Sequence, residues 1–469
     1  MYNFFVVIGI RSVNFTSQSL KSMKHIDVNQ KYLSIFFLLM AVCSSHLTMA
    51  QQELDAYFDH LCQNRKMMGS VAIIHRDSIL YAKSVGYADV ATRHKNDNNT
   101  KFRIGSITKT YTAVMVLQAV EKGKLRLDTY LAAYYPQIKN AEKITVEQML
   151  KHRSGIVNFT DIEGEEIWEQ SYHTEAEFIR YIENRESDFE PGTAYAYSNT
   201  NYALLGFILE KVYHKPFGEI LWENICAPLQ LSHTYYSTER DPSRNEAASY
   251  NIQQEYIQNV KVNFSNHPAS GGMVSTAIEL NKFLYALFEG QLISAQSLAL
   301  MLPANKGEYG MGIEKAGFKN PVGYMHSGRV ENYFADYWYF PDEKLGVVTL
   351  CNAVNIDLSS IQNTLTLYAF HQQPVLPDFN KTKDLTPDQF SRIKGTYANV
   401  DSTDSITISS DGKNLIFQSS AMGQMYVPFN SKGNNSFEYA DGAVSLQFIP
   451  DDGRVILKQE GTVYEYKKI

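Results

Sequence analysis

The chain lacks several features on which whole classes of protein depend. It has only four cysteines among 469 residues and no Cys-x-x-Cys pair, which excludes a disulfide framework or a cysteine-built zinc site. It has no His-Glu-x-x-His sequence and no other cluster with metal-ligand spacing, so we expect neither a metal nor another cofactor. With 43 basic and 50 acidic residues, a formal net charge of -7 and no long basic run, the sequence argues against a nucleic-acid-binding protein.

Long apolar runs are scarce, and the one near the N-terminus is short. Residues 33–42 are almost all apolar and follow Lys24 and Lys31, and Ala50 ends a segment with small residues. This order is typical of a secretory signal peptide, and the run is too short to span a membrane comfortably. We therefore expect residues 1–50 to be a signal peptide and the mature protein to be secreted or periplasmic.

Two residues of this segment leave alternatives open. The residues before Met23 fit poorly as the start of a signal peptide, so Met23 is an alternative initiator. Cys43 would allow a lipid anchor, although the preceding Val42 is larger than the small residue that usually stands there. We expect membrane contact only through this segment or such an anchor, and lipidation is the less favoured alternative.

The composition is that of an ordinary globular protein, with 44% hydrophobic and 20% charged residues. The chain is long enough for one large and one small domain. Residues 51–372 are predicted to form the large domain, and Pro374 and Pro377 mark a linker over residues 373–384. In residues 385–469 short strand-like segments alternate with turns, which predicts a small antiparallel barrel or meander. These turns are predicted at Asp411-Gly412, Lys432-Gly433, Asp441-Gly442 and Asp452-Gly453.

The large domain mixes the two kinds of secondary structure. A hairpin is predicted over residues 70–85, and two more strands over 333–340 and 344–352. Helical periodicity predicts helices over residues 106–123 and 356–370, among others. This order predicts an α+β domain, with a sheet flanked by helices.

One segment of the large domain combines a nucleophile with a base. Ser106 and Lys109 lie three residues apart at the head of a predicted helix, so they share one helix face. Residues 111–120 are apolar nearly all round, which predicts a buried helix and a buried start for the Lys109 side chain. A serine hydroxyl becomes a good nucleophile when a neighbouring base takes its proton, and lysine is such a base only when burial or charge lowers its pKa.

The same Ser-x-x-Lys pattern occurs at two other places. Ser391 and Lys394 precede a Gly and are predicted to form a capped surface turn. Ser410 and Lys413 flank an Asp-Gly turn, so no helix aligns them. The pattern alone is therefore weak, and we favour Ser106 because of its helix head and buried continuation.

Two further short motifs follow in order. Tyr197-Ser-Asn199 comes about 90 residues after the Ser-x-x-Lys pair, and His326-Ser327-Gly328 comes about 130 residues further on, at the edge of a predicted strand pair. Neither motif is specific alone, since a chain with 31 tyrosines contains Tyr-x-Asn by chance. The order of the three motifs and their structural context carry the information.

This ordered set resembles the motifs of the serine β-lactamase and penicillin-binding protein superfamily. The similar branch is that of the class C β-lactamases and their relatives, which include D-alanyl-D-alanine carboxypeptidases, D-aminopeptidases and esterases. The resemblance covers roughly residues 53–370, and it implies a β-lactamase-like antiparallel sheet flanked by helices, a helical subdomain and a small C-terminal all-β domain. It also rests on residues 125–128, 149–155, 202–206 and 269–276.

By this resemblance Ser106 is the nucleophile that forms an acyl-enzyme, and Lys109 and Tyr197 share the acid–base work. Tyr197 acts as a base only if a nearby cation depresses its pKa, and Lys109 is the obvious cation. Asn199 would hold either the substrate amide or the Lys109 amine. The oxyanion hole would use the backbone N–H groups of Ser106 and Arg329.

The third motif departs from the lactamase pattern. The resemblance assigns substrate binding to His326, Ser327, Gly328 and Arg329. His326 stands where lactamases commonly carry Lys, and His occurs in the esterase and peptidase branches, so antibiotic hydrolysis is less expected. A mostly neutral imidazole is also a weaker anchor for a substrate carboxylate, and Arg329 either supplies that anchor or is simply solvated. Asn332 stands where relatives usually have Gly, which would reshape the rim of the site.

Two other features have structural explanations that we favour over a chemical role. His152 ends a predicted helix over residues 145–152, where an imidazole satisfies the last carbonyl groups. The Gly-rich loop over residues 269–276 lacks the Lys-Ser/Thr of a phosphate-binding P-loop. We interpret this loop as backbone that passes close to a core or cleft.

The sequence therefore predicts a secreted serine hydrolase that acts through an acyl-enzyme on a small peptide or ester. The favoured substrate is a D-amino-acid peptide of cell-wall type, as for a D,D-carboxypeptidase or a D-aminopeptidase. A small-ester esterase or a β-lactamase of the same fold is the first alternative. The others are a catalytically silent binding protein on this fold and a structural envelope protein held by its C-terminal domain.

Overall fold

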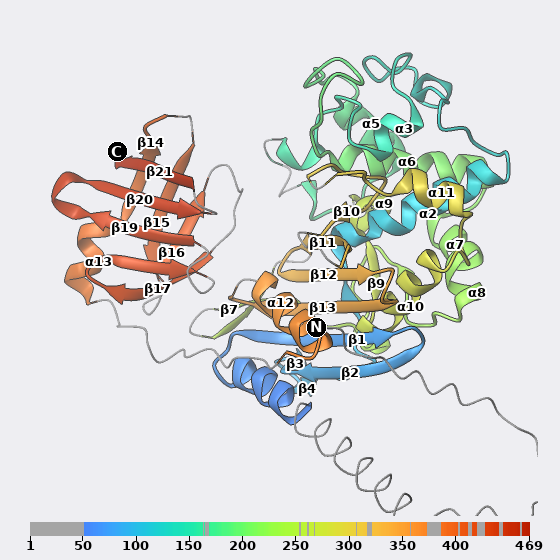
Figure 1. Ribbon diagram of the computed structural model, residues 1–469. Helices are drawn as coiled ribbons and strands as arrows, with labels where there is room; N and C mark the ends of the chain where they lie inside the picture. The colour runs from blue at the N-terminus through green and yellow to red at the C-terminus, as the bar shows by residue number, and fades with distance from the viewer. Residues whose placement is uncertain are drawn as a thin grey trace, which may run out of the picture. The chain divides into compact units, whose positions relative to one another are not determined.

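The structure is a computed structural model that describes residues 51–469 apart from short gaps (Figure 1). The gaps are residues 163, 165–167, 253–254, 260–261, 267, 306, 317–320, 357, 373–385, 402–403, 411–414, 420–426, 440–443 and 460–461. The predicted signal peptide, with Met23 and Cys43, and the predicted linker over residues 373–384 lie outside the described residues. Within the described part of the chain, no helix has both the length and the apolar character needed to cross a bilayer.

A six-stranded antiparallel sheet is the centre of the structure that carries the Ser-x-x-Lys segment, in the order β10-β11-β12-β13-β1-β2 (Figure 1). Its strands are β1 (Met67–His75), β2 (Ser78–Val85), β10 (Glu314–Lys315), β11 (Tyr324–Val330), β12 (Tyr333–Phe340) and β13 (Leu345–Val354). β13 is rich in Val and Leu and is buried along nearly its whole length, as a central strand is when both sheet faces are covered. The predicted hairpin and the two predicted strands are confirmed.

Helices cover both faces of this sheet. They are α2 (Thr108–Glu121), α10 (Ala277–Phe288), α12 (Leu358–Ala369) and a helix over residues 53–63. Side chains of β12 alternate between the faces. Tyr333 and Tyr337 join the core that contains α2 and α10, whereas Trp338 and Phe340 join the core that contains α12 and the helix over 53–63. We call these the α2 face and the α12 face of the sheet.

α2 is buried on all sides, as its apolar sequence predicted, and further helices contribute side chains to the core that contains it. These are α3 (Val146–Leu150), α5 (Glu175–Ile182), α6 (Asn199–Tyr213), α7 (Phe217–Leu221), α8 (Ala227–Leu229), α9 (Pro268–Gly271), α11 (Ala295–Met301) and the π-helix η5 (Trp222–Cys226). α3 begins with a capping box, in which Thr145 accepts from the Gln148 N–H and the Gln148 side chain accepts from the Thr145 N–H. Such a cap stabilises a helix start by about 1 kcal/mol.

Short elements complete this part of the structure. β9 (Met273–Ser275) pairs with β5 (Phe102–Arg103) and with β6 (Tyr235–Tyr236), β3 (Tyr87–Asp89) pairs with β4 (His94–Lys95), and β7 (Tyr250–Ile252) pairs with β8 (Tyr256–Gln258). The short helical turns are η2 (Gly105–Ile107), η3 (Leu131–Ala133), η4 (Phe159–Asp161), η6 (Pro242–Arg244) and η7 (Phe264–Asn266). The pairing of β5 with β9 fixes the chain immediately before Ser106.

The C-terminal residues form a closed antiparallel barrel, β14 to β21, which confirms the predicted all-β structure. Its strands are β14 (Gly395–Asn399), β15 (Ser405–Ser410), β16 (Leu415–Ser419), β17 (Val427–Gly433), β18 (Ser436–Tyr439), β19 (Val444–Ile449), β20 (Arg454–Gln459) and β21 (Thr462–Lys468), preceded by α13 (Pro387–Ile393) and interrupted by η10 (Pro450–Asp452). Inward-facing apolar side chains fill the barrel, among them Phe417, Phe437 and Phe448. The barrel interior is thus a packed core.

Two details of this barrel differ from the sequence prediction. Ser391 lies within α13 and not in a surface turn, because Thr386 caps a helix whose start the Pro387 ring favours. The turn expected at Lys432-Gly433 lies after β17, at Asn434 and Asn435, both with positive φ, and such residues adopt the left-handed conformation readily. The Asp452-Gly453 turn is confirmed, with Gly453 at φ 61°. The other two predicted turns, Asp411-Gly412 and Asp441-Gly442, lie outside the described residues.

Candidate active site

Ser106 lies in η2, a single turn between β5 and α2 that packs against β11. The turn depends on two glycines. Gly105 has φ 50°, and a Cβ on it would lie 2.6 Å from the backbone nitrogen of Arg329. A Cβ on Gly328 would lie 2.0 Å from the Ile104 carbonyl oxygen and 3.0 Å from the Ser106 nitrogen. Because neither glycine has a side chain, the two backbone segments can pack closely, and the backbone amides of Ser106 and Arg329 lie near each other.

The Lys109 amine is fully buried and makes three polar contacts. It lies 2.7 Å from Oδ1 of Asn199, 2.8 Å from the carbonyl oxygen of Ser270 and 2.9 Å from Oγ of Ser106. Burial holds the pKa of Lys109 well below its ordinary value, which favours the neutral form of the amine. A neutral amine has two N–H groups and one lone pair. The Asn199 and Ser270 oxygens can only accept, so they take the two N–H groups and the lone pair is directed to the Ser106 hydroxyl.

Tyr197 completes the group around Ser106. Its ring lies 4.8 Å from the Lys109 nitrogen, and its phenol hydrogen-bonds the Ser106 side chain. Burial raises the pKa of Tyr197, and the hydrogen bond with Ser106 offsets only part of this rise. The condition under which Tyr197 would act as a base, a pKa depressed by Lys109, is therefore not met in this structure. Tyr197 is a protonated phenol next to the Ser106 hydroxyl, and it has a proton to donate.

His152 holds the Tyr197 segment in place, a role that the sequence analysis missed. It has φ 52° at the end of α3, and the N–H groups of His152 and Arg153 satisfy the last α3 carbonyls in a Schellman arrangement. The imidazole is not used for that purpose, which corrects the sequence interpretation. Its Nδ1 accepts from the Ser198 N–H at 3.0 Å, and its ring centroid lies 4.3 Å from that of Tyr197. A non-glycine residue in this left-handed conformation costs about 1–2 kcal/mol.

The neutral state of His152 follows from its surroundings. Its ring is completely buried, and this burial holds the pKa of His152 well below its usual value. Because Nδ1 accepts a hydrogen bond, the proton of the neutral ring is on Nε2. No sequence signal separates this His from an ordinary helix-end histidine. Only the packing of α3 against α6 reveals it.

His326 is buried and neutral rather than a cationic anchor. Its Nδ1–H donates to the carbonyl oxygen of Ser327 at 2.6 Å, and its Nε2 accepts from the Tyr309 hydroxyl at 2.8 Å. Burial lowers the pKa of His326 to about 3. Both ring nitrogens are therefore occupied within the protein. Tyr309, which the sequence analysis did not single out, also lies beside Tyr197, with ring centroids 5.9 Å apart.

Ser327 and Arg329 direct their side chains away from Ser106. Alternation along β11 places His326 and Gly328 on the α2 face and Ser327 and Arg329 on the α12 face. The Arg329 guanidinium lies 5.1 Å from the Phe334 ring centroid on that face. Of the two alternatives for Arg329, the carboxylate anchor is not supported, and only its backbone N–H lies beside the Ser106 turn.

The Gly-rich loop over residues 269–276 passes close to the buried Lys109 side chain, consistent with the prediction that it lies close to a core or cleft. Ser270 in α9 supplies the carbonyl oxygen that Lys109 contacts, and the Ala269 carbonyl oxygen accepts from the Thr112 hydroxyl in α2. Asn332, on the turn after β11, donates from its backbone N–H to Ser249 Oγ and from its side chain to Asn259. The rim of the site is thus fastened to the segment before α9. Within the described residues, no group of three or more His, Cys, Asp or Glu side chains is placed to hold a metal ion.

Replacing Gly328 by Ala is expected to lower kcat/KM by about 10²–10³-fold, the usual cost of losing one oxyanion-hole donor. The new methyl group would collide with the Ile104 carbonyl and push β11 away from Ser106, which separates the two amides. Steady-state kinetics on an ester substrate measures the effect. Gly218→Ala is the matched control, because the nearest atom to its new Cβ is 3.9 Å away. Equal activities for the two variants would show that this strand contact does not serve catalysis.

The geometry around Ser106 can be compared with known proteins. The sequence model of the family described as Beta-lactamase matches residues 54–366, about two thirds of the chain. The chain belongs to the beta-lactamase family. This membership confirms the resemblance and the α+β fold predicted from the motifs, and it supports a serine hydrolase.

Individual relatives of this beta-lactamase family member are distant. It is 27% identical over 316 residues to Protein flp from Staphylococcus aureus (strain MW2), which covers 65% of this chain and 63% of that protein. The chain thus spans slightly less than two thirds of the length of that relative. Its fold is similar to an octameric penicillin-binding protein homologue from Pyrococcus abyssi, with a TM-score of 0.60, 23% identity and coverage of 89% and 99% of the two chains. It is also similar to D-amino acid amidase from Ochrobactrum anthropi SV3, with a TM-score of 0.57, 25% identity and coverage of 69% and 98%.

Proposed function

We propose that this protein is a serine hydrolase that forms an acyl-enzyme on Ser106, with an amide or ester of a D-configured amino acid as its substrate. The observation that carries the proposal is the buried Lys109 amine, which lies 2.7 Å from Asn199 Oδ1, 2.8 Å from the Ser270 carbonyl oxygen and 2.9 Å from Ser106 Oγ. With its pKa lowered by burial and its N–H groups donated to Asn199 and Ser270, the neutral amine directs its lone pair to the Ser106 hydroxyl. A base in this position raises the nucleophilicity of the serine without any proton having to leave a charged group first.

The proposed acylation step balances within these residues. Ser106 Oγ bonds to the scissile carbonyl carbon while its proton passes to Lys109. The resulting oxyanion is stabilised by the backbone N–H groups of Ser106 and Arg329. The bond to the leaving group then breaks as the Tyr197 phenol donates its proton to the departing nitrogen or oxygen, and Tyr197 recovers a proton from the Lys109 ammonium. A water molecule repeats the sequence on the acyl-enzyme and releases the acid.

The charges around Ser106 indicate which leaving groups the site can bind. A penicillin or a peptide ending in D-alanine presents a carboxylate on the leaving-group side, which needs a cation. Here His326 is neutral and engaged with Tyr309, and Arg329 points to the other face of β11. This favours a leaving group without a carboxylate, as in D-aminopeptidase or amidase substrates, over D,D-carboxypeptidase or β-lactamase activity. The similarity to D-amino acid amidase supports the same choice.

The test is a matched substrate panel on the purified protein. We expect kcat/KM for a D-alanyl peptide amide to exceed that for the same peptide with a free carboxylate by at least about tenfold, the size of one lost charge contact. The L-configured amide is expected to react more slowly than the D form. A preference for the free carboxylate would identify a carboxypeptidase instead.

A small-ester esterase is the second candidate, because the absence of a cationic anchor beside Ser106 among the described residues suits uncharged substrates equally well. Turnover of p-nitrophenyl acetate with no turnover of any D-amide would favour it. A folded protein that hydrolyses nothing and takes up no fluorophosphonate would favour the silent binding protein. We also propose secretion, which N-terminal sequencing of the mature protein tests by finding or not finding a start after Ala50.

A further inference from the structure

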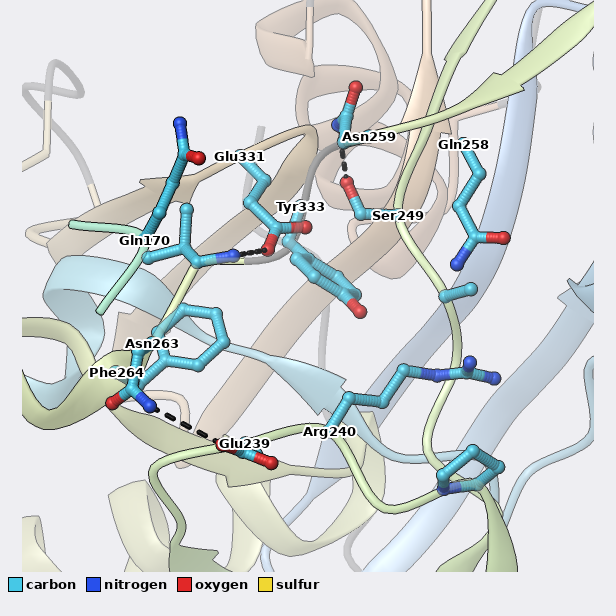
Figure 2. Close-up of a pocket in the computed structure, with 13 residues that line it drawn as sticks. Gln170, Glu239, Arg240, Ser249, Gln258, Asn259, Asn263, Phe264, Glu331 and Tyr333 are labelled. Carbon is cyan, nitrogen blue, oxygen red and sulfur yellow. Dashed lines mark hydrogen bonds between the residues drawn. The ribbon is translucent and has the colours of Figure 1, made fainter. Parts of the chain in front are cut away.

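A cavity of about 260 Å³ lies at the C-terminal end of β11, just beyond the strand that carries the Arg329 amide. Glu331 and Tyr333, on either side of the β11–β12 turn, form one wall (Figure 2). Phe264 lies on another side, and Glu239 and Arg240 lie at a third. No step of the proposed acylation uses this cavity.

The position of the cavity relates it to the acyl half of a substrate. The leaving group must lie near its proton donor, Tyr197. The Tyr197 ring contacts Tyr309, and the Tyr309 hydroxyl hydrogen-bonds His326 in the first half of β11. The leaving group therefore lies toward the start of β11. The scissile oxygen lies between the amides of Ser106 and Arg329. A substrate extended along the edge of β11 therefore directs its acyl half past Arg329, toward Glu331 and the cavity.

Glu331 is the chemically distinctive group there. Its Oε1 accepts from the Val262 N–H at 3.3 Å, and its carboxyl also hydrogen-bonds Ser249. Within the described residues it forms no ion pair with a Lys or Arg side chain. Burial raises the pKa of Glu331 to about 7, with Glu169 adding to the rise and Arg103 opposing it.

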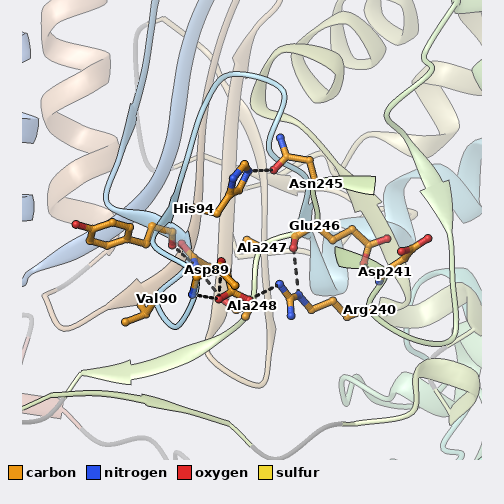
Figure 3. A network of polar contacts seen from close by, with 12 residues as sticks. Asp89, Val90, His94, Arg240, Asp241, Asn245, Glu246, Ala247 and Ala248 are labelled. Carbon is orange, nitrogen blue, oxygen red and sulfur yellow. Dashed lines mark hydrogen bonds and ion pairs between the residues drawn. The ribbon is translucent and has the colours of Figure 1, made fainter. Parts of the chain in front are cut away.

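Two arginines near the cavity, among the residues that the structure describes, are already engaged. Arg240 pairs with Asp89 at 3.2 Å and donates to the Glu246 carbonyl oxygen (Figure 3). Arg103 is almost fully buried, pairs with Glu246 and stacks on the Phe264 ring, with its guanidinium 3.8 Å from the ring centroid. Glu239 adds a second carboxylate to the cavity. Because these two arginines are paired with other carboxylates, the carboxyl oxygens of the cavity can accept a cation from a ligand.

We propose that this cavity binds an ammonium group carried by the acyl half of the substrate, with Glu331 as its acceptor. Glu331 follows Arg329 by two residues and lies in the turn after β11, so its backbone is at most about 7 Å from that of Arg329, whose amide lies beside the scissile carbonyl. The α-amine of the residue that supplies that carbonyl is only about 2.5 Å from it and too close to reach Glu331. The ammonium belongs to the preceding residue, either as a lysine-like side-chain amine or as the free N-terminus of a dipeptidyl group. This inference rests on the proposed acyl-enzyme function.

The experiment compares four substrates with a common D-alanine p-nitroanilide. Acetyl-lysyl and acetyl-norleucyl forms differ only in the side-chain ammonium, and glycyl and acetyl forms differ in an N-terminal one. We expect the ammonium form of at least one pair to have a KM about tenfold lower, and Glu331→Gln to remove that ratio. The pair that responds identifies the source of the ammonium. Glu343→Gln, in the turn between β12 and β13 at the other end of β12, is the matched control and keeps the ratio.

The pH dependence of KM gives a second test of the proposal. Because the carboxyl must be ionised to bind ammonium, the KM of the responding substrate is expected to fall as pH rises from 6 to 8, and Glu331→Gln removes this trend. Equal KM values within both pairs, or a preference that survives in Glu331→Gln, would overturn the proposal while leaving the hydrolase function intact.

A direct binding measurement covers the case in which no substrate is cleaved. The Ser106→Ala protein is titrated calorimetrically with acetyl-lysyl-D-alanine amide and its norleucine analogue, and then with the glycyl and acetyl forms. Roughly tenfold tighter binding of an ammonium form supports the cavity assignment even if the hydrolase proposal fails. Equal binding within both pairs overturns the assignment.

Discussion

The Ser106→Ala variant is expected to lose at least about 10⁴-fold in kcat, as enzymes do when a nucleophile is removed. The reason is that the alanine has no atom able to form the acyl bond, and the neighbouring Lys109 cannot replace it because it is buried behind the turn. The measurement is the rate of p-nitrophenyl acetate hydrolysis, together with the intact mass of the protein after a fluorophosphonate probe. Wild type gains the mass of one probe, and the variant gains none.

Ser391 provides a matched control for this prediction. It belongs to a second Ser-x-x-Lys sequence, but it is exposed in α13 and its hydroxyl donates to the Asp388 carbonyl oxygen. Ser391→Ala is expected to react with the probe and to turn over substrate at the wild-type rate. Full labelling of Ser106→Ala would place the nucleophile elsewhere and would end the proposed mechanism.

The Lys109→Met variant is expected to lose about 10³–10⁴-fold in kcat, the upper range for removal of a general base. Methionine fills much of the same volume but has no lone pair for the Ser106 proton. Lys109→Arg is expected to be equally poor, because a guanidinium stays protonated and cannot act as a base. Lys122→Met, just beyond the end of α2, is the control with expected wild-type activity, since Lys122 is exposed. Substantial activity in Lys109→Met would transfer the role of base to another group.

The same variant tests the charge state of Lys109 through stability. In the unfolded chain this amine keeps its proton up to about pH 10.4, whereas in the folded protein burial makes it lose the proton at much lower pH. Between those two pKa values the unfolded state binds more protons, so this residue makes the free energy of unfolding rise with pH. Urea unfolding at pH 6, 7.5 and 9 is expected to show wild type gaining stability relative to Lys109→Met. A constant difference would show that Lys109 stays charged when folded.

The sequence predicted the main elements well where local physics is sufficient. The apolar residues of α2 predicted its burial, and the strand patterns predicted the hairpin β1–β2 and the strands β12 and β13. The order of the three motifs predicted the superfamily, because motif spacing is a property of the linear chain. The sequence also predicted a helix over residues 145–152, where α3 begins with the Thr145 cap, because helix starts and side-chain capping depend on neighbours in the chain.

The sequence did not predict which way the site side chains point. Arg329 directs its guanidinium to the α12 face because β11 alternates, and a shift of one residue in strand register would reverse that direction. His152 was assigned to its own helix, yet its ring supports the Ser198 backbone 46 residues later. Tyr197 could act as a base only if a charged Lys109 depressed its pKa, but burial favours the neutral form of Lys109 and raises the Tyr197 pKa. Each of these depends on contacts between distant segments.

The sequence by itself determined the family and the α+β class and predicted the reactive side chains, because these depend on residue types and their order along the chain. Only the tertiary structure decided their ionisation. Burial of Lys109, Tyr197 and His326 together favours their neutral forms, and burial depends on segments far apart in the chain. The same packing left Glu331 beside a cavity without a cation partner among the described residues, which no local pattern could have indicated.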